Sequence, residues 1–136
     1  MQLISVRIIT SDVPRLVAFY EHVIGGTAVW GNELFAEVAT PLATVAIGSE
    51  RTVPLFGAGV AEPGANRSVI IELIVDDVDD EFTRLAPLLA EQGLDVVQPP
   101  TTMPWGNRSL LVRDPDGNLV NLFTPVGEQA RVKFGV

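Results

Sequence analysis

The sequence lacks cysteine altogether and has a single histidine among its 136 residues. Without cysteine, neither a disulfide nor thiol chemistry is available, and we take a cytoplasmic location as the default expectation. The one histidine, His22, falls inside a predicted helix, so a Ser-His-Asp triad has no suitable base. No glycine-rich phosphate-binding motif is present either.

Basic residues are also scarce, because 9 Lys and Arg stand against 17 Asp and Glu, for a formal net charge of −8. This balance argues against a nucleic-acid partner, whose phosphates need a basic surface. It would favour a cationic small molecule through the summed field of the surface. The alternative, left open at this stage, is that the charge serves solubility alone.

Long apolar runs are missing as well. No stretch approaches the roughly 20 apolar residues that span a bilayer, so we expect no membrane partner. The start of the chain, MQLISVRIIT, has neither the charged beginning nor the cleavage site of a signal peptide. With 47% hydrophobic residues, the chain is expected to fold as one globular domain with a core of its own.

The clearest local pattern lies at residues 105–123. Two runs rich in Leu and Val flank the sequence DPDGN at 114–118. Proline fixes φ at the first corner of a turn, and the Asp, Gly and Asn that follow tolerate or supply a positive φ. The pattern therefore predicts a β-hairpin, and it explains both aspartates without any catalytic role.

Part of the sequence of this hairpin is repeated at residues 30–47. The sequence WGN at 30–32 returns at 105–107, an offset of 105 − 30 = 75, although Pro41 is displaced by one residue from Pro115. We interpret this repetition as an internal repeat in which the two tryptophans open matching hairpins.

A second offset supports the repeat. Predicted helices begin at the capping residues Asp12 and Asp77, an offset of 77 − 12 = 65, and each follows a predicted strand. We expect Pro87 to kink or shorten the second helix. The predicted order of elements is strand, helix and three strands, and it occurs twice along the chain. This order predicts an α+β fold. We divide the chain into one domain, residues 1–126, made of modules 1–49 and 69–126 with a linker at 50–68, followed by a C-terminal tail at 127–136 that is either loose or docked on a neighbour.

Three sets of residues stand out together: Ser11-Asp12 with Phe19-Tyr20 and Gly25, residues 75–79 (VDDVD), and residues 113–122 (RDPDGNLVNL). In this order and spacing they resemble one known superfamily, the vicinal oxygen chelate fold. It includes lactoylglutathione lyase, extradiol dioxygenases, and fosfomycin- and bleomycin-resistance proteins. The resemblance implies two βαβββ modules whose strands form a cupped mixed sheet around a cleft, with the helices outside.

The metal-binding members of that superfamily hold a divalent ion from four strand positions. Carried over one by one, these positions are Ser5, Ala46, Ile70 and Asn121. Ala and Ile cannot bind a metal, and Ser and a neutral amide are poor ligands for a transition metal. The resemblance is therefore closest to the metal-less, bleomycin-resistance-like members, and we expect neither a metal nor another cofactor.

Strand alternation places Ser5 and Arg7 on the predicted cleft face of the first module, and Glu72 on that of the second. Arg7 and Glu72 occupy equivalent positions, 7 + 65 = 72, in otherwise apolar strands. One interpretation is a salt bridge that joins the modules, since burying either charge alone is costly. The other is that one or both charges meet a polar ligand.

Aromatic and amide side chains complete the candidate binding set. Trp30 and Trp105 could stack on a planar or cationic ligand, as could Phe35, although each ring could equally pack its hairpin onto a helix. Asn121 lies between two apolar residues of the last strand and is expected to point into the cleft.

Three functions remain open. The first is a small-molecule binding protein, a homodimer that sequesters a cationic or aromatic antibiotic-like ligand, as the resemblance to bleomycin-resistance proteins implies. The second is a superfamily enzyme of lyase or dioxygenase type with an atypical metal or none, in which Glu72 would be the base and Arg7 its electrostatic partner. The third is a domain for self-association or regulation.

Overall fold

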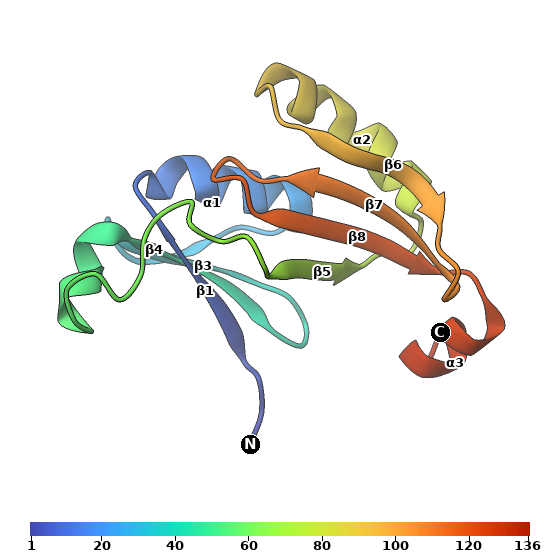
Figure 1. The fold of residues 1–136 in the computed structure, drawn as a ribbon, viewed down its shortest axis with the longest axis horizontal. Helices are drawn as coiled ribbons and strands as arrows, with labels where there is room; N and C mark the ends of the chain where they lie inside the picture. The colour runs from blue at the N-terminus through green and yellow to red at the C-terminus, as the bar shows by residue number, and fades with distance from the viewer. The chain divides into compact units, whose positions relative to one another are not determined.

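The computed structural model describes residues 1–136, which form two compact units, Met1–Asn66 and Arg67–Val136. Each unit contains one four-stranded mixed sheet with helices, so the predicted α+β class is confirmed (Figure 1). No helix is both long enough and apolar enough to cross a membrane.

The first unit follows the predicted order of strand, helix and three strands. Its sheet has the strand order β1-β4-β3-β2, in which β1 runs parallel to β4 and the other pairs are antiparallel. The elements are β1 (Ser5–Thr10), α1 (Val13–Ile24), β2 (Val29–Asn32), β3 (Phe35–Ala39), β4 (Thr44–Ser49) and the 3-10 helix η1 (Glu50–Leu55).

Helix α1 begins and ends where the sequence predicts. The Asp12 side chain accepts a hydrogen bond from the backbone N–H of Arg15, and Gly25 closes the helix with φ of 76°. Its buried stripe contacts β3 and β4. Each large apolar side chain buried in this way contributes on the order of 2 kcal/mol. The stripe includes the predicted Leu16, Phe19, Tyr20 and Val23.

The second unit repeats the order. Its sheet has the strand order β5-β8-β7-β6, again with one parallel pair, β5 and β8. The elements are β5 (Ile70–Ile74), α2 (Val78–Glu91), β6 (Val96–Thr102), β7 (Asn107–Arg113), β8 (Leu119–Pro125) and α3 (Glu128–Phe134).

Helix α2 starts at the predicted cap. Asp77 accepts hydrogen bonds from the backbone N–H groups of Asp79 and Asp80. The helix continues through Pro87 to Glu91, so the predicted shortening at this proline is wrong. The buried residues Val78, Leu85 and Leu89 form its inner face.

The pairing of the strands confirms both repeat offsets. Arg7 pairs with Ala46 in the first sheet and Glu72 with Asn121 in the second, where 7 + 65 = 72 and 46 + 75 = 121. Residues 40–43 connect β3 to β4, whereas residues 114–118 connect β7 to β8. The second turn is therefore one residue longer, which explains the displaced proline.

The predicted equivalence of the two tryptophans is wrong. Trp30 lies within β2 and pairs with Ala36, whereas Trp105 lies in the turn between β6 and β7. The repeated sequence WGN therefore begins within a strand in the first unit and within a turn in the second. Strand β6 carries two register shifts and contains Pro99 and Pro100, so it departs from β2 in both length and regularity.

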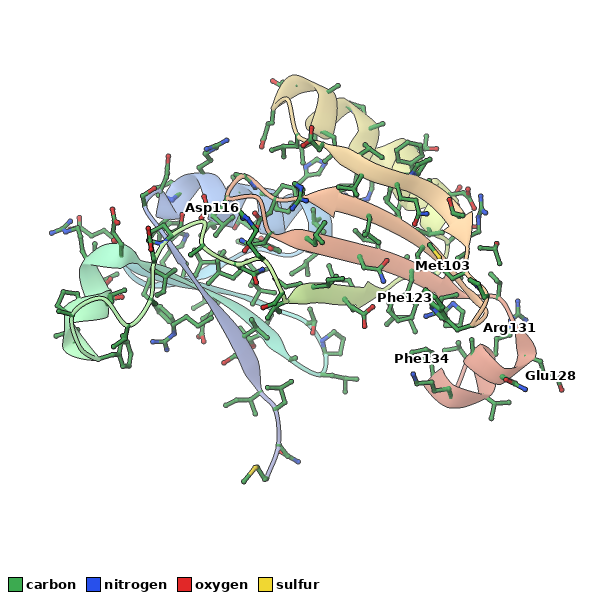
Figure 2. The ribbon with its side chains drawn as sticks, in the orientation of Figure 1. Met103, Asp116, Phe123, Glu128, Arg131 and Phe134 are labelled. Atoms are coloured by element: carbon green, nitrogen blue, oxygen red, sulfur yellow. The ribbon has the colours of Figure 1, made fainter.

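Both segments expected to lie outside the modules contain helix. Residues 50–55 of the expected linker form η1, and most of the expected tail forms α3. Helix α3 packs against β8 of its own unit, with the rings of Phe123 and Phe134 5.1 Å apart. Figure 2 shows Phe134 on the part of α3 near Phe123. The tail is therefore a packed element of the second unit.

Candidate functional site

One face of the second sheet lies opposite α2 and carries a mixed set of polar and apolar side chains. The face toward α2 is fixed by two contacts, because Arg108 binds Asp79 and Thr124 accepts from the N–H of Val78. Alternation then assigns the other face. We call it the Glu72 face, and it comprises Ile70, Glu72, Ile74, Asn107, Ser109, Leu111, Asn121 and Phe123.

A hydrogen bond joins the two polar residues at the centre of this face. Asn121 Nδ2 donates to Glu72 Oε1 over 2.9 Å, between directly paired residues of β8 and β5. Glu72 is exposed, whereas Asn121 is only 7% exposed. The donor holds the carboxylate in a fixed orientation, which leaves its remaining lone pairs available to another donor.

Several oxygens on the same face have no hydrogen-bond partner. The Oδ1 atom of Asn121 and the Oγ atom of Ser109 are both buried and unsatisfied. Ser109 pairs with Phe123, next to Asn121 on the same face. A buried polar atom without a partner costs about 1–3 kcal/mol, so such atoms mark places where a ligand or water supplies the missing contact.

The first sheet offers a cation among aromatic rings. The Arg7 guanidinium lies 4.9 Å from the ring centre of Phe35 and 5.6 Å from that of Phe56. Gly48, which pairs with Phe35, lies beside this contact, and a Cβ there would be in ordinary van der Waals contact with Arg7 Cδ at 3.8 Å. Ser5 lies two residues from Arg7, on the same face.

The predicted site residues thus fall into four places. Ser5, Arg7 and Phe35 share one face of the first sheet, and Glu72 and Asn121 are bonded on the second. Trp30 pairs with the buried Ala36, on the opposite face of the first sheet from Arg7. Trp105 lies in the β6–β7 turn and is 66% exposed.

Arg7 and Glu72 each have a partner within their own unit. Arg7 contacts two aromatic rings, and Glu72 accepts the Asn121 amide. Both residues are exposed, so the premise that each charge is buried in an apolar strand is wrong.

Two residues of the Glu72 face were missed by the sequence analysis. Asn107 and Ser109 alternate with Arg108 in β7, and both are buried at 8% and 1% exposure. Polar residues at every second position of a strand are the signal that could have identified them.

The donor set does not suit a divalent metal. Two of the four family positions are the aliphatic Ala46 and Ile70, and the other two, Ser5 and Asn121, offer only a neutral hydroxyl and a neutral amide. No group of three or more His, Cys, Asp or Glu side chains is arranged to hold an ion. Zinc and related metals require imidazole, thiolate or carboxylate donors, so the residues at these positions do not fit such an ion.

A family model decides the relationship of the chain to known proteins, because it matches residues 2–122. The chain belongs to the Glyoxalase/Bleomycin resistance protein/Dioxygenase superfamily. No curated protein matches the chain.

Solved structures of the superfamily are similar over nearly their whole length. A member from Sphaerobacter thermophilus is 31% identical, with a TM-score of 0.65, covering 91% of this chain and 97% of that one. A family enzyme from Burkholderia phytofirmans is 19% identical, with a TM-score of 0.78, covering 93% and 100%. A protein from Nocardioides is 21% identical, with a TM-score of 0.74, covering 94% and 85%. The two last similarities are evidence for the fold alone.

Proposed function

We propose that this superfamily member binds a small molecule without transforming it, and that its Glu72 face holds a protonated amine. The observation that supports this most directly is the pair of Asn121 and Glu72. The pair presents a carboxylate and a buried, unsatisfied amide oxygen on one face. Two acceptors side by side select a ligand rich in N–H donors, and a cation above all.

The surroundings favour a ligand that also has apolar parts. The exposed side chains of Ile70 and Ile74 share the face with the two acceptors. A mostly apolar lining with a few placed polar groups is typical of a small-molecule site. The net charge of −8 adds a field that concentrates cations near the surface. Basic, aromatic antibiotics of the bleomycin class have this chemistry.

Sequestration needs affinity and no reaction chemistry. The unsuitable donors at the four family positions are the reason for proposing that it proceeds without metal. In the first unit, taken by itself, Ser5, Arg7 and Phe35 form a separate surface, where a cation beside an aromatic ring suits planar or anionic groups. The protein would act as a homodimer, the commonest symmetric assembly, and sedimentation equilibrium measures this directly.

Titration with bleomycin and phleomycin, followed by tryptophan fluorescence, tests the proposal. We expect saturable binding that weakens at least tenfold in the Glu72→Gln variant, since a hydrogen bond to a charged group is lost. The Glu91→Gln variant is the matched control, because it removes one negative charge at the exposed end of α2. A flat response to both drugs, or equal weakening by the two variants, contradicts the proposal.

The second candidate is a superfamily enzyme in which Glu72 is a general base. The observation that favours it is the orientation of the Glu72 carboxylate by the Asn121 amide. Elemental analysis of the purified protein separates the two functions, because stoichiometric zinc, nickel or iron would support the enzyme.

A further inference from the structure

A pocket lies entirely within the second unit, between α3 and the turn that joins β6 to β7. It has a volume of about 250 Å³ and is lined by Trp105, Asn107, Gln129, Ala130, Lys133 and Phe134. The four helical residues have the spacing i, i+1, i+4 and i+5, so they form one face of α3. Of the seven ligand-binding residues predicted from the sequence, only Trp105 lies in this pocket.

The walls of this pocket are held in place at both ends of α3. At the first end, Gly106 O accepts hydrogen bonds from Val126 N and Gly127 N, at 2.9 and 2.8 Å. The two glycines approach so closely that a Cβ on Gly127 would lie 3.0 Å from Gly106 Cα. At the second end, the ring of Phe134 packs on Phe123. The pocket is therefore preformed and does not depend on a mobile tail.

One polar side chain in the pocket lacks a partner. Asn107 is 8% exposed, and its Oδ1 atom is buried without any hydrogen bond. Its backbone is engaged, because its carbonyl oxygen accepts from Met103 N at 2.7 Å. A buried amide oxygen with no donor is the feature that a bound N–H or O–H group would satisfy.

The other pocket residues indicate which further chemical groups suit the site. Trp105 and Phe134 supply aromatic surface, and the Lys133 ammonium lies 5.0 Å from the Phe134 ring centre without forming an ion pair. A planar ring suits the aromatic walls, and a carboxylate suits the unpaired ammonium. The volume lies just below the range for drug-sized ligands, which limits the occupant to about one or two rings.

We propose that this pocket binds a small aromatic carboxylate that also carries a hydrogen-bond donor. The donor bonds to Asn107 Oδ1, the ring lies against Trp105 and Phe134, and the carboxylate pairs with Lys133. The pocket shares Asn107 with the Glu72 face but differs from the rest of that face in charge, because it selects an anion. It stands whether or not Glu72 binds a cation.

Three probes separate the parts of this recognition. 4-Hydroxybenzoate carries ring, donor and acid, benzoate lacks the donor, and phenol lacks the acid. The indole N–H signal of Trp105 reports binding in two-dimensional NMR, and the Trp30→Phe variant assigns it, because the chain has only two tryptophans. We expect 4-hydroxybenzoate to bind most tightly, with benzoate about tenfold weaker and phenol weaker still.

Variants of the pocket complete the test. Lys133→Met should weaken 4-hydroxybenzoate at least tenfold and leave phenol unchanged, whereas Arg131→Met, the same charge change on the same helix outside this pocket, should leave both unchanged. Asn107→Leu should remove the preference for 4-hydroxybenzoate over benzoate, and circular dichroism with a melting curve confirms that it folds. No shift with any probe, or affinities that Lys133→Met and Asn107→Leu leave unchanged, would overturn the proposal.

Discussion

Asn121 Nδ2 donates a 2.9 Å hydrogen bond to Glu72 Oε1 across the parallel pair of β8 and β5. The same pairing in the first unit joins Arg7 to Ala46, which has no polar side chain. The duplicated modules therefore place a polar pair at this position in one sheet only.

Replacing Asn121 by Asp should destabilise the protein at neutral pH. The substitution puts a second carboxylate against Glu72 and removes the donor, and like charges at this distance oppose joint ionisation. We expect the loss at pH 7 to shrink as the pH falls toward 4, because protonation of one carboxyl restores a donor. Urea denaturation at the two pH values measures it. Asn121→Leu, which adds no charge, is the control, and an equal loss at both pH values for Asn121→Asp contradicts the account.

The ion pair of Asp79 and Arg108 should make stability depend on acid pH. The hydrogen bonds from Arg108, at 2.6 and 2.7 Å, lower the pKa of Asp79 below its ordinary value. A depressed folded-state pKa means that the contribution is fully present above the unfolded value and is lost as the pH falls through the folded one. Wild type should therefore lose more stability between pH 5 and pH 3 than Asp79→Asn.

Asp80→Asn is the matched control for that experiment. It removes the same charge from the same first turn of α2, without touching Arg108. We expect its melting temperature to follow wild type between pH 5 and pH 3. Identical acid profiles for Asp79→Asn and wild type would show that the ion pair makes no contribution.

Asp114 should be the most sensitive residue of the β7–β8 turn. Its side chain is 2% exposed, and it accepts hydrogen bonds from the N–H groups of Asp116 and Asn118 and from Asn118 Nδ2. We expect Asp114→Ala to lower the free energy of unfolding by about 3 kcal/mol, since it leaves these buried donors unsatisfied. Thr40→Ala, in the exposed turn between β3 and β4, should cost less than about 1 kcal/mol. Equal losses in urea denaturation are incompatible with this reading.

Gly106→Ala should loosen α3. Gly106 has φ of 90°, and a Cβ would lie 3.3 Å from both Ala130 Cβ and Gly127 Cα. Gly117→Ala measures the cost of a positive φ without a steric clash, because Gly117 has φ of 83° and open space around it. We expect losses of about 3 kcal/mol for Gly106 and about 1 kcal/mol for Gly117. Hydrogen exchange should show faster exchange within α3 only for Gly106→Ala.

The sequence was sufficient for features that depend on local chemistry. The caps at Asp12 and Asp77, the DPDGN turn and the buried stripe of α1 are each set by neighbouring residues, and the structure confirms them. The structure also confirms the two repeat offsets, because two modules with the same fold keep the same register between their paired strands.

Features that depend on distant contacts were not predictable in this way. Helix α3 has only seven residues, too few to be stable alone, and it is held by Phe123 and by the close approach of Gly106 and Gly127. The two tryptophans were matched from three identical letters, although Trp30 lies within β2 and Trp105 lies in the turn that follows the longer β6. The unsatisfied oxygens of Asn107 and Ser109 required the packed structure to be recognised.

On the proposed function, the Glu72 carboxylate holds a cationic ligand without help from a metal. Calorimetric titration of bleomycin into wild type and Glu72→Gln, with both proteins in a buffer containing EDTA, tests this. We expect a measurable dissociation constant for wild type and one at least tenfold larger for Glu72→Gln. Equal affinity in the two proteins, or no binding until EDTA is removed and a divalent metal restored, would contradict it.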